Sequence, residues 1–390
     1  MDGIASPWAP LAPSTRRVAL ELLRHGPLAR SELALRLGLS AASLTRLTKP
    51  LLGAGMLRES PDVLPTSGGR PLQPLDVDAG RQRFVGIKLT RDRAYGVLTD
   101  LRADILARRS VAIGEASPDR VVERLVSLIA ELTPGAGPAA VGVGLGGAVR
   151  GFTHVRRAPF LGWREVALGR LVADATGYPS VISNDLEALT EAEHWFGDGR
   201  GVRNFAVLTV GAGVGGGLVV HDRLVAGPDA GLGLLGHFPL DPSGPACPEG
   251  HHGCADALLT THGIRLQASL ALGRTVSYEE ALDLAEAGEP VAGRIVGIAA
   301  RALGALVAAV ANIAQPERIL VTGEGVRLAR AGEERVRDAV AGARVPGASP
   351  VDLRILDDDP TLWARGAASV AIQRVVLADL PPDAGAPASP

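Results

Sequence analysis

Aromatic residues, methionine, cysteine and lysine are all scarce in this 390-residue chain. Phe, Trp and Tyr together make up 3% of the residues, and there are only two methionines and two cysteines. Two cysteines exclude the dense disulfide framework of a small secreted domain. The cations are almost all arginine, since lysine occurs only at Lys49 and Lys88.

The chain also lacks a long unbroken hydrophobic run. Its most apolar stretch, Ile295–Ala314, is rich in Ala and Gly and is interrupted by Arg301, which favours a buried helix over a membrane span. No signal peptide opens the sequence, so we expect a cytoplasmic protein. The net charge of −2 excludes a wholly basic nucleic-acid coat, and 46% hydrophobic residues are enough for two or three domain cores.

The segment Ser31–Leu57 is the most informative part of the sequence, and it predicts two short helices around a tight turn. Ser31 is positioned to cap the first helix, and Ser40 to cap the second. Gly38 supplies the left-handed turn residue between them. The first helix would hold Leu33, Ala34 and Leu37 on one face. This geometry places a helix in a DNA groove.

The second of these helices has two different faces. Leu44, Leu47 and Leu51 repeat at the spacing of a core-facing stripe. The opposite face combines small and polar residues with two cations, namely Ala42, Ser43, Thr45, Arg46 and Lys49. Because such side chains suit phosphates and base edges, we expect DNA contacts from Ser43, Thr45, Arg46 and Lys49.

Flanking features favour a winged helix-turn-helix. Residues 14–25 predict a third helix, capped by Ser14 and packed through Val18, Ala19, Leu22 and Leu23. Gly55 ends the recognition helix, and a β-wing follows whose glycine-rich tip would present Arg70 to a narrow minor groove. Eight Lys and Arg against two Glu between Ser14 and Arg58 give a formal charge of +6. The alternative is a helical hairpin inside an ordinary α/β domain.

From Arg83 onward the pattern changes to that of an α/β core. The strands FVGIKL, AYGVLTDL and ILARRSVAI precede a helix over 118–132 and the buried strand AAVGVGLGG. A second unit repeats this order with FAVLTV, GLVVHDRLVAG, a long helix over 294–315 and ILVTG. The repetition predicts a duplicated α/β architecture with a ligand cleft between its halves.

Two motifs in this core are candidates for chemistry. Gly211–Gly217 satisfies G-x-G-x-x-G, but strand follows it instead of helix, so it predicts a strand-turn-strand loop whose amides could hold phosphate. Asn184 and Asp185 follow an apolar strand and precede a helix, and Asp185 could accept a proton from a sugar hydroxyl. A plain glycine-rich hairpin and an ordinary helix cap are the alternatives.

A third cluster uses both cysteines of the chain. His237, Cys247 and Cys254 supply two thiolates and one imidazole, so one further ligand would complete a tetrahedral Zn2+ site. Glu249 is the first candidate for that ligand, with His251 and His252 as rivals. A pair of reduced cysteines in a His-containing loop is the alternative.

Together these motifs resemble the ROK family of repressors, uncharacterised reading frames and sugar kinases, from Ser14 to about Ala378. Gly-Gly-Arg-Pro in the wing resembles the regulator branch, and Gly211–His237 followed by Cys247 and Cys254 resembles the family signature. Asn184-Asp185 matches the catalytic Asn-Asp, and Gly323-Glu324-Gly325 matches the segment at the adenosine end of the nucleotide. The resemblance implies a winged helix-turn-helix followed by a duplicated actin/hexokinase-like (ribonuclease H-like) ATPase-type core, in a homodimer or homotetramer.

The sequence departs from the family's kinases at several positions. Lys88-Leu89-Thr90-Arg91-Asp92 stands where kinases carry Asp-x-Gly-Gly-Thr, and its bulky side chains should obstruct ATP phosphates. Leu234 and Asp256 replace two sugar-binding Glu residues, and Phe160 replaces an Asn. A polar site that loses partners binds sugar less well. Glu249 replaces the middle zinc cysteine.

We therefore expect three domains, a winged helix-turn-helix over 14–78, a first lobe over 83–200 and a second lobe with the zinc loop over 201–378. The predicted function is a transcriptional regulator, a repressor that binds double-stranded operator DNA and is not a kinase. Its core would bind a sugar or related effector through Asn184, Asp185, His237 and Asp256, with Asp185 a degenerate catalytic residue. The alternatives are a core used only for oligomerisation or a non-sugar effector, and an active ATP-dependent sugar kinase.

Overall fold

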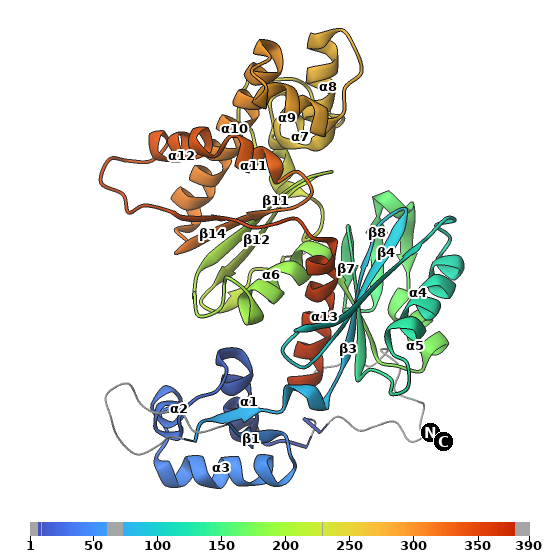
Figure 1. Ribbon diagram of the computed structural model, residues 1–390, viewed down its shortest axis with the longest axis vertical. Coiled ribbons are helices and arrows are strands. Elements are labelled where there is room, and N and C mark those ends of the chain that lie inside the picture. Colours follow the sequence, from blue (N-terminus) through green and yellow to red (C-terminus); the bar gives the residue numbers. More distant parts are fainter. Residues whose placement is uncertain (1–6, 9, 61–72, 228, 379–390) are drawn as a thin grey trace. The chain divides into compact units, whose positions relative to one another are not determined.

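The structure is a computed structural model that describes residues 7–8, 10–60, 73–227 and 229–378 (Figure 1). Its contacts divide the chain into two units. Unit 1 comprises residues 1–201 and 360–390, and unit 2 comprises residues 202–359. Arg70 and the rest of the predicted wing tip lie outside the described residues.

Unit 1 begins with three helices and a two-stranded antiparallel sheet, which we call the head. Its elements are α1 (Pro13–His25), α2 (Arg30–Leu37), α3 (Ala41–Gly53), β1 (Leu57–Glu59) and β2 (Leu75–Val77). The predicted apolar stripes of α1 and α3 are buried. Gly38 has φ +65° between α2 and α3, and Ser40 caps α3 by accepting a hydrogen bond from the Ser43 amide at 3.2 Å, both as predicted.

The predicted caps of the first two helices are wrong. Helix α1 starts at Pro13, with Ala12 and not Ser14 at its N-cap, because proline at the first helical position already has the required φ. Helix α2 starts at Arg30, before Ser31. There Leu28 exchanges backbone hydrogen bonds of 3.0 and 2.9 Å with Leu75 of β2, so strand pairing sets where the chain can turn into the helix.

The rest of unit 1 is built on a five-stranded sheet of order β10-β6-β3-β4-β5. Its strands are β3 (Phe84–Leu89), β4 (Arg93–Thr99), β5 (Ile105–Ala112), β6 (Ala140–Leu145) and β10 (Ser180–Asn184). Helices α4 (Pro118–Leu132), α5 (Leu168–Thr176) and α6 (Asp185–Phe196) accompany it, together with a small sheet of β7 (Ala148–Arg150), β8 (His154–Ala158) and β9 (Trp163–Val166). β3 pairs antiparallel with β4 and parallel with β6.

Unit 2 has a sheet of order β13-β12-β11-β14-β15 with the same pairing pattern, in which β11 pairs antiparallel with β12 and parallel with β14. Its strands are β11 (Phe205–Val210), β12 (Val214–Val220), β13 (Arg223–Leu224), β14 (Arg318–Thr322) and β15 (Asp352–Ile355). Its helices are α7 (Ala255–Leu259), α8 (Thr261–Leu272), α9 (Tyr278–Glu286), α10 (Pro290–Ala314), α11 (Arg327–Ala331) and α12 (Glu333–Gly342). The two sheets share one topology, as predicted for a duplicated core.

The segment 217–227, which the sequence places in the second strand-rich unit, contains a hairpin. It reverses between β12 and β13 at His221 and Asp222, whose φ values are +51° and +60°. Positive φ at both central residues is typical of the type I′ turn, which matches the twist of a two-residue hairpin.

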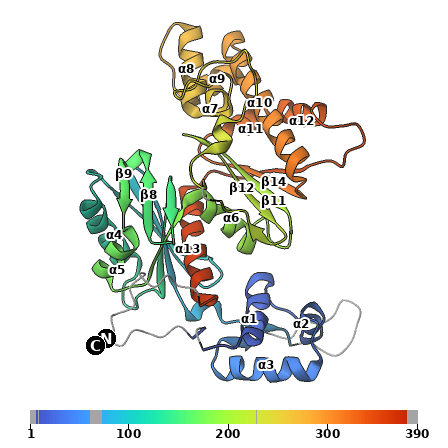
Figure 2. The same cartoon turned by 180° about the vertical axis from the view of Figure 1, so that it is seen from behind.

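Helix α13 (Pro360–Val376) packs in unit 1 and not in the second lobe, which corrects the expected extent of that lobe, 201–378. Both views show α13 against the sheet that contains β3 (Figures 1 and 2). The contact is close because Gly86 and Gly142 face it. A side chain at Gly142 would overlap the carbonyl of Ala367.

One hydrophobic cluster joins the head to this helix. It contains Val18 and Leu22 of α1, Leu75 of β2, and Ile372 and Val376 of α13. The expected boundary between the first two domains lies at residues 78–83. Because this cluster contains residues from both sides of it, the boundary stays a prediction.

Helix α10 is the single helix of the described residues that is long and apolar enough to cross a membrane by length and composition. Its most apolar window is 61% buried inside the structure. Leu303, Leu306 and Val307 lie in the hydrophobic core of unit 2, in agreement with the predicted buried helix.

We expect Gly86→Ala to destabilise the protein by about 3 kcal/mol, because its Cβ would overlap the Ala364 carbonyl and lie 2.6 Å from the Ala368 nitrogen. Urea unfolding followed by circular dichroism measures this change. The control is Gly293→Ala in α10, where nothing lies within 4 Å and alanine stabilises a helix by up to ~1 kcal/mol. Equal unfolding midpoints for Gly86→Ala and the unmodified protein would contradict the proposed close contact.

Candidate functional site

The exposed face of α3 is the first candidate site. Leu44, Leu47 and Leu51 are buried beneath it, whereas Thr45, Arg46 and Lys49 are exposed and Ser43 is half-buried. Within the described part of the chain, neither Arg46 nor Lys49 forms an ion pair. Both cations are therefore available to an external anion.

The hydroxyl groups of this face have local partners. Ser43 accepts a hydrogen bond from the Ser40 hydroxyl at 3.1 Å, and Thr45 donates to the Ala41 carbonyl at 2.9 Å. These bonds fix the two hydroxyls against the helix and leave oxygen lone pairs as acceptors. Of the predicted DNA contacts, Arg46 and Lys49 have the longest reach.

The second candidate site lies where β10 ends and α6 begins. Asn184 caps α6, because its side-chain oxygen accepts from the amides of Leu186 at 3.0 Å and Glu187 at 3.1 Å. Its amide nitrogen donates to the Gly147 carbonyl at 3.0 Å. Asn184 thus serves as the helix cap that the sequence offered as an alternative to a ligand contact.

Asp185, the first residue of α6, is paired with Lys88 of β3. One carboxylate oxygen accepts from the Leu186 amide at 2.9 Å, and the other forms an ion pair with the Lys88 ammonium. The two side chains are only 13% and 15% exposed, so solvent screens the pair weakly. Lys88 also lies 4.5 Å from the ring centroid of Trp363 in α13, a cation–π distance.

The sequence did not predict the pairing of Lys88 with Asp185. The signal that could have found it is the scarcity of lysine, which occurs at only two positions. Lys88 also stands at the acidic position of the kinase pattern, at the end of a strand that lies two strands from β10.

The surroundings of Asp185 combine glycine with an exposed aromatic residue. A Cβ on Gly146 would lie 3.6 Å from the Asp185 carboxylate and 3.5 Å from the ring of Phe160. Phe160 is 57% exposed, and its carbonyl accepts a hydrogen bond from Arg91 at 3.2 Å. An apolar ring therefore flanks Asp185 in unit 1.

In unit 2, the glycine-rich turn between β11 and β12 holds a carboxylate of the chain itself. The Ala212 amide donates to Glu324 at 2.7 Å, and a Cβ on Gly211 would lie 2.6 Å from the same carboxylate. Tyr278 binds the backbone of the residue after Glu324, because its hydroxyl donates to the Gly325 carbonyl at 2.7 Å. Burial raises the pKa of Tyr278, so it stays a donor.

Asp256 and His237 are neighbours in unit 2. The Asp256 carboxylate accepts from the Val214 amide at 3.0 Å and lies against Gly236, where a Cβ would approach within 2.5 Å. Burial raises the pKa of Asp256, while the hydrogen bond from Val214 and the charge of His237 lower it. Leu234, three residues before His237, is 66% exposed.

The four predicted effector contacts fall into two groups. Asn184 and Asp185 belong to unit 1, and His237 and Asp256 belong to unit 2. Asn184 and Asp185 are adjacent at the start of α6. Asp256 comes close to His237 because it contacts Gly236, the residue before His237.

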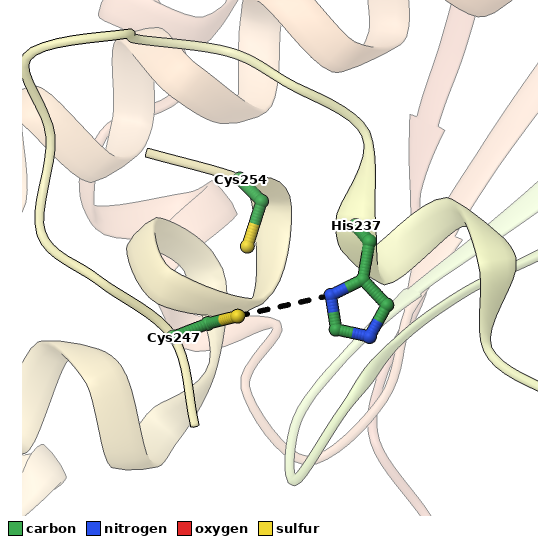
Figure 3. A group of neighbouring side chains, drawn as sticks. All are labelled: His237, Cys247 and Cys254. Atoms are coloured by element: carbon green, nitrogen blue, oxygen red, sulfur yellow. Dashed lines mark hydrogen bonds between the residues drawn. The ribbon is translucent and has the colours of Figure 1, made fainter. Parts of the chain in front are cut away.

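The third candidate site is a metal centre. Figure 3 shows His237, Cys247 and Cys254 with their ligand atoms turned toward one another. These atoms all lie within 4.8 Å of one another. Both cysteines are buried, and burial raises the pKa of the Cys254 thiol. Two sulfurs and one imidazole are a donor set that suits zinc. Glu249 and His251, both exposed, lie outside this group of described residues.

The two repeated sheets and the polar residues at their strand ends define an α/β core of the actin-like, sugar-kinase type. The sequence profile of the ROK family matches residues 84–371, and the chain belongs to this family.

Three relatives illustrate the range of the family. The chain is 33% identical to a glucokinase from Thermotoga maritima, over 67% of this chain and 88% of that protein. It is 25% identical to the DNA-binding transcriptional repressor Mlc from Escherichia coli, over 76% and 77% of the two chains. The crystal structure of a ROK family transcriptional regulator, a homologue of E. coli Mlc, matches with a TM-score of 0.77 and 26% identity, over 93% of this chain and 97% of that one.

We expect Lys88→Met to destabilise the protein by roughly 3 kcal/mol, because it leaves the buried Asp185 carboxylate without its cation. Adding Asp185→Asn should recover most of this loss, and a double-mutant cycle by urea unfolding measures the coupling. Arg120→Ala is the control, since the exposed Arg120–Glu123 pair contributes less than about 1 kcal/mol. Additive effects of the Lys88 and Asp185 changes would contradict the ion pair.

Proposed function

We propose that this protein is a DNA-binding transcriptional regulator, a repressor, with a winged helix-turn-helix at its N-terminus. The observation that carries the proposal is α3, which buries three leucines and exposes Thr45, Arg46 and Lys49 on its other face. The extent of the regulator match supports the same conclusion, since the sequence match to the repressor Mlc covers 76% of this chain while the match to the glucokinase covers 67%.

In this proposal α3 is the recognition helix and α2 crosses the DNA backbone. Ser43, Thr45, Arg46 and Lys49 contact phosphates and base edges in the major groove. β1 and β2 form the stem of the wing, and Arg70, which falls in the sequence between them, is the proposed minor-groove contact. Two copies in a homodimer, or four in a homotetramer, would present paired heads to an operator with two half-sites.

The core of the regulator is not a kinase in this proposal. A general base needs a free carboxylate within hydrogen-bond reach of the substrate hydroxyl, and Lys88 is bound to Asp185. Phosphoryl transfer depends on positioning the phosphates of ATP. Glu324 already accepts from the glycine-rich loop at Ala212, and its negative charge repels a phosphate there.

We assign an effector role to this core, with a sugar or sugar derivative as the ligand. The relatives include an N-acetylglucosamine repressor from E. coli and a xylose repressor from Bacillus spizizenii, whose names link such regulators to sugars. Asn184, Asp185, His237 and Asp256 are the proposed contacts. A non-sugar effector, or a core that serves only oligomerisation, is favoured by the exposed Phe160 and Leu234 where polar residues are expected. Saturable heat in calorimetry with a sugar would exclude this alternative.

Helix α6 offers a route from the effector site to the head. It begins at Asp185 and ends beside α1, where Arg24 lies 3.2 Å from the His194 imidazole and 5.7 Å from the Trp195 ring centroid. Arg102 adds a second link, because it donates to the Leu22 carbonyl at 2.8 Å and pairs with the buried Asp76. A shift of α6 would therefore reach α1 through direct contacts.

We further propose that His237, Cys247 and Cys254 hold a structural Zn2+. Bound zinc would crosslink the loop between η3 (Leu234–His237) and α7 by coordination. Two of the three ligands are positioned by secondary structure, since His237 is the last residue of η3 and Cys254 is the N-cap of α7.

Arg46→Ala should weaken binding to the best operator sequence by about 10–100-fold and reduce discrimination against single-base changes, because a bidentate arginine–base contact is worth ~1–3 kcal/mol. Gel shifts with a sequence selected from a random pool by the full-length protein measure this. Arg337→Ala in unit 2 is the control and should have no effect. Unchanged affinity of Arg46→Ala would overturn the assignment of α3.

The unmodified protein should consume no ATP above background with hexoses, N-acetylhexosamines or pentoses in a coupled assay. The reason is that both Asp185 and the Ala212 amide already have charged partners. The Thermotoga glucokinase serves as the positive control for the assay. Saturable, sugar-dependent turnover would show that the core is a kinase.

A further inference from the structure

The loop that contains Cys247 closes on itself at His251. The Cys247 amide donates to the His251 carbonyl at 2.8 Å, and the Gly250 amide donates to the Cys247 carbonyl at 2.9 Å. Gly250 permits this turn because its φ is +87°. The turn brings Cys247 and His251 to the same end of the loop, with Glu249 between them in the sequence.

The side chains of Cys247 and His251 also lie close together, next to His237. The Nδ1 atom of His251 lies 3.2 Å from Nδ1 of His237 and 3.7 Å from Sγ of Cys247, and the last two atoms are 3.9 Å apart. A tetrahedral zinc site with Zn–N near ~2.05 Å and Zn–S near ~2.3 Å has N–N edges of about 3.3 Å and N–S edges of about 3.6 Å. The three distances fit the edges of one face of such a tetrahedron.

A hydrogen bond between the two imidazoles accounts for only part of this arrangement. Such a bond would join the two Nδ1 atoms, which lie 3.2 Å apart, but it does not involve the Cys247 sulfur. The rings are tilted by 51° with centroids 4.6 Å apart, and the thiol of Cys247 approaches both Nδ1 atoms. A cation shared by these lone pairs accounts for all three approaches.

We propose that His251, and not Glu249, is the fourth ligand of the metal site formed with His237, Cys247 and Cys254. The chain thus replaces the missing cysteine with a histidine two positions further along. Two thiolates and two neutral imidazoles balance the charge of Zn2+, whereas a glutamate ligand would leave the site with a net negative charge close to the Asp256 carboxylate, which lies against Gly236. The proposal concerns metal binding alone and is independent of DNA recognition.

The test compares the full-length protein with His251→Ala, Glu249→Gln and His252→Ala after anaerobic reduction and reloading with Zn2+ or Co2+. Zinc per chain is measured by mass spectrometry, zinc affinity by competition with a chromogenic chelator, and ligand type by the visible absorption of the cobalt forms. His252→Ala is the matched control, because it removes an imidazole from the adjacent, exposed position.

We expect one metal ion per unmodified chain and a tetrahedral cobalt spectrum. His251→Ala should lower zinc affinity by more than the ~10–100-fold that loss of a supporting residue costs, and should shift the cobalt bands. Glu249→Gln and His252→Ala should leave both unchanged. His251→Cys should restore tight binding with stronger sulfur-to-cobalt absorption, which distinguishes ligand loss from misfolding.

Three results would overturn the proposal. They are an unmodified protein that binds no metal, a His251→Ala protein with unchanged affinity and spectrum, and a loss of affinity confined to Glu249→Gln. The last result would return the fourth position to the glutamate. Each of these outcomes leaves the proposed DNA-binding function to its own test.

Discussion

Unit 1 depends on the close contact of α13 with two glycines of its sheet. Because Gly86 and Gly142 have no side chains, the helix backbone approaches β3 and β6 directly. The apolar side of α13 then joins the cluster that buries α1 and β2 of the head. The same helix brings Trp363 beside Lys88. A segment near the end of the chain thus supports both the head and the surroundings of Asp185.

The core has the sugar-kinase-type fold, and two of its polar positions are paired with charged groups of the chain itself. Lys88 neutralises Asp185 in unit 1, and Glu324 accepts from the glycine-rich loop in unit 2. Both contacts give a polar group of the core a charged partner from the chain itself. In the proposed regulator these groups serve binding and stability, and α6 is the proposed route to the head.

Much of the fold could be predicted because its signals are local. The bounds of β3, β11 and α4 match the apolar patterns of their own residues, and Gly38 and Ser40 act as predicted. Predictions failed where contacts with a segment distant in the sequence determine the local structure. The start of α2 depends on pairing between Leu28 and Leu75, which no pattern within the helix encodes.

The candidate sites divide in the same way. The residues available to each site can be read from the sequence: a polar face on α3, the Asn184-Asp185 pair, and a cluster of Cys and His in one loop. Tertiary structure decided their partners, since Lys88 is 97 residues from Asp185 and Glu324 is 112 residues from Ala212. It also brought His251 rather than Glu249 to His237. The sequence gives residue type and local spacing. Ion pairs and the contacts of the proposed metal site depend on distances between side chains that are far apart in the sequence, and only the folded backbone sets those distances.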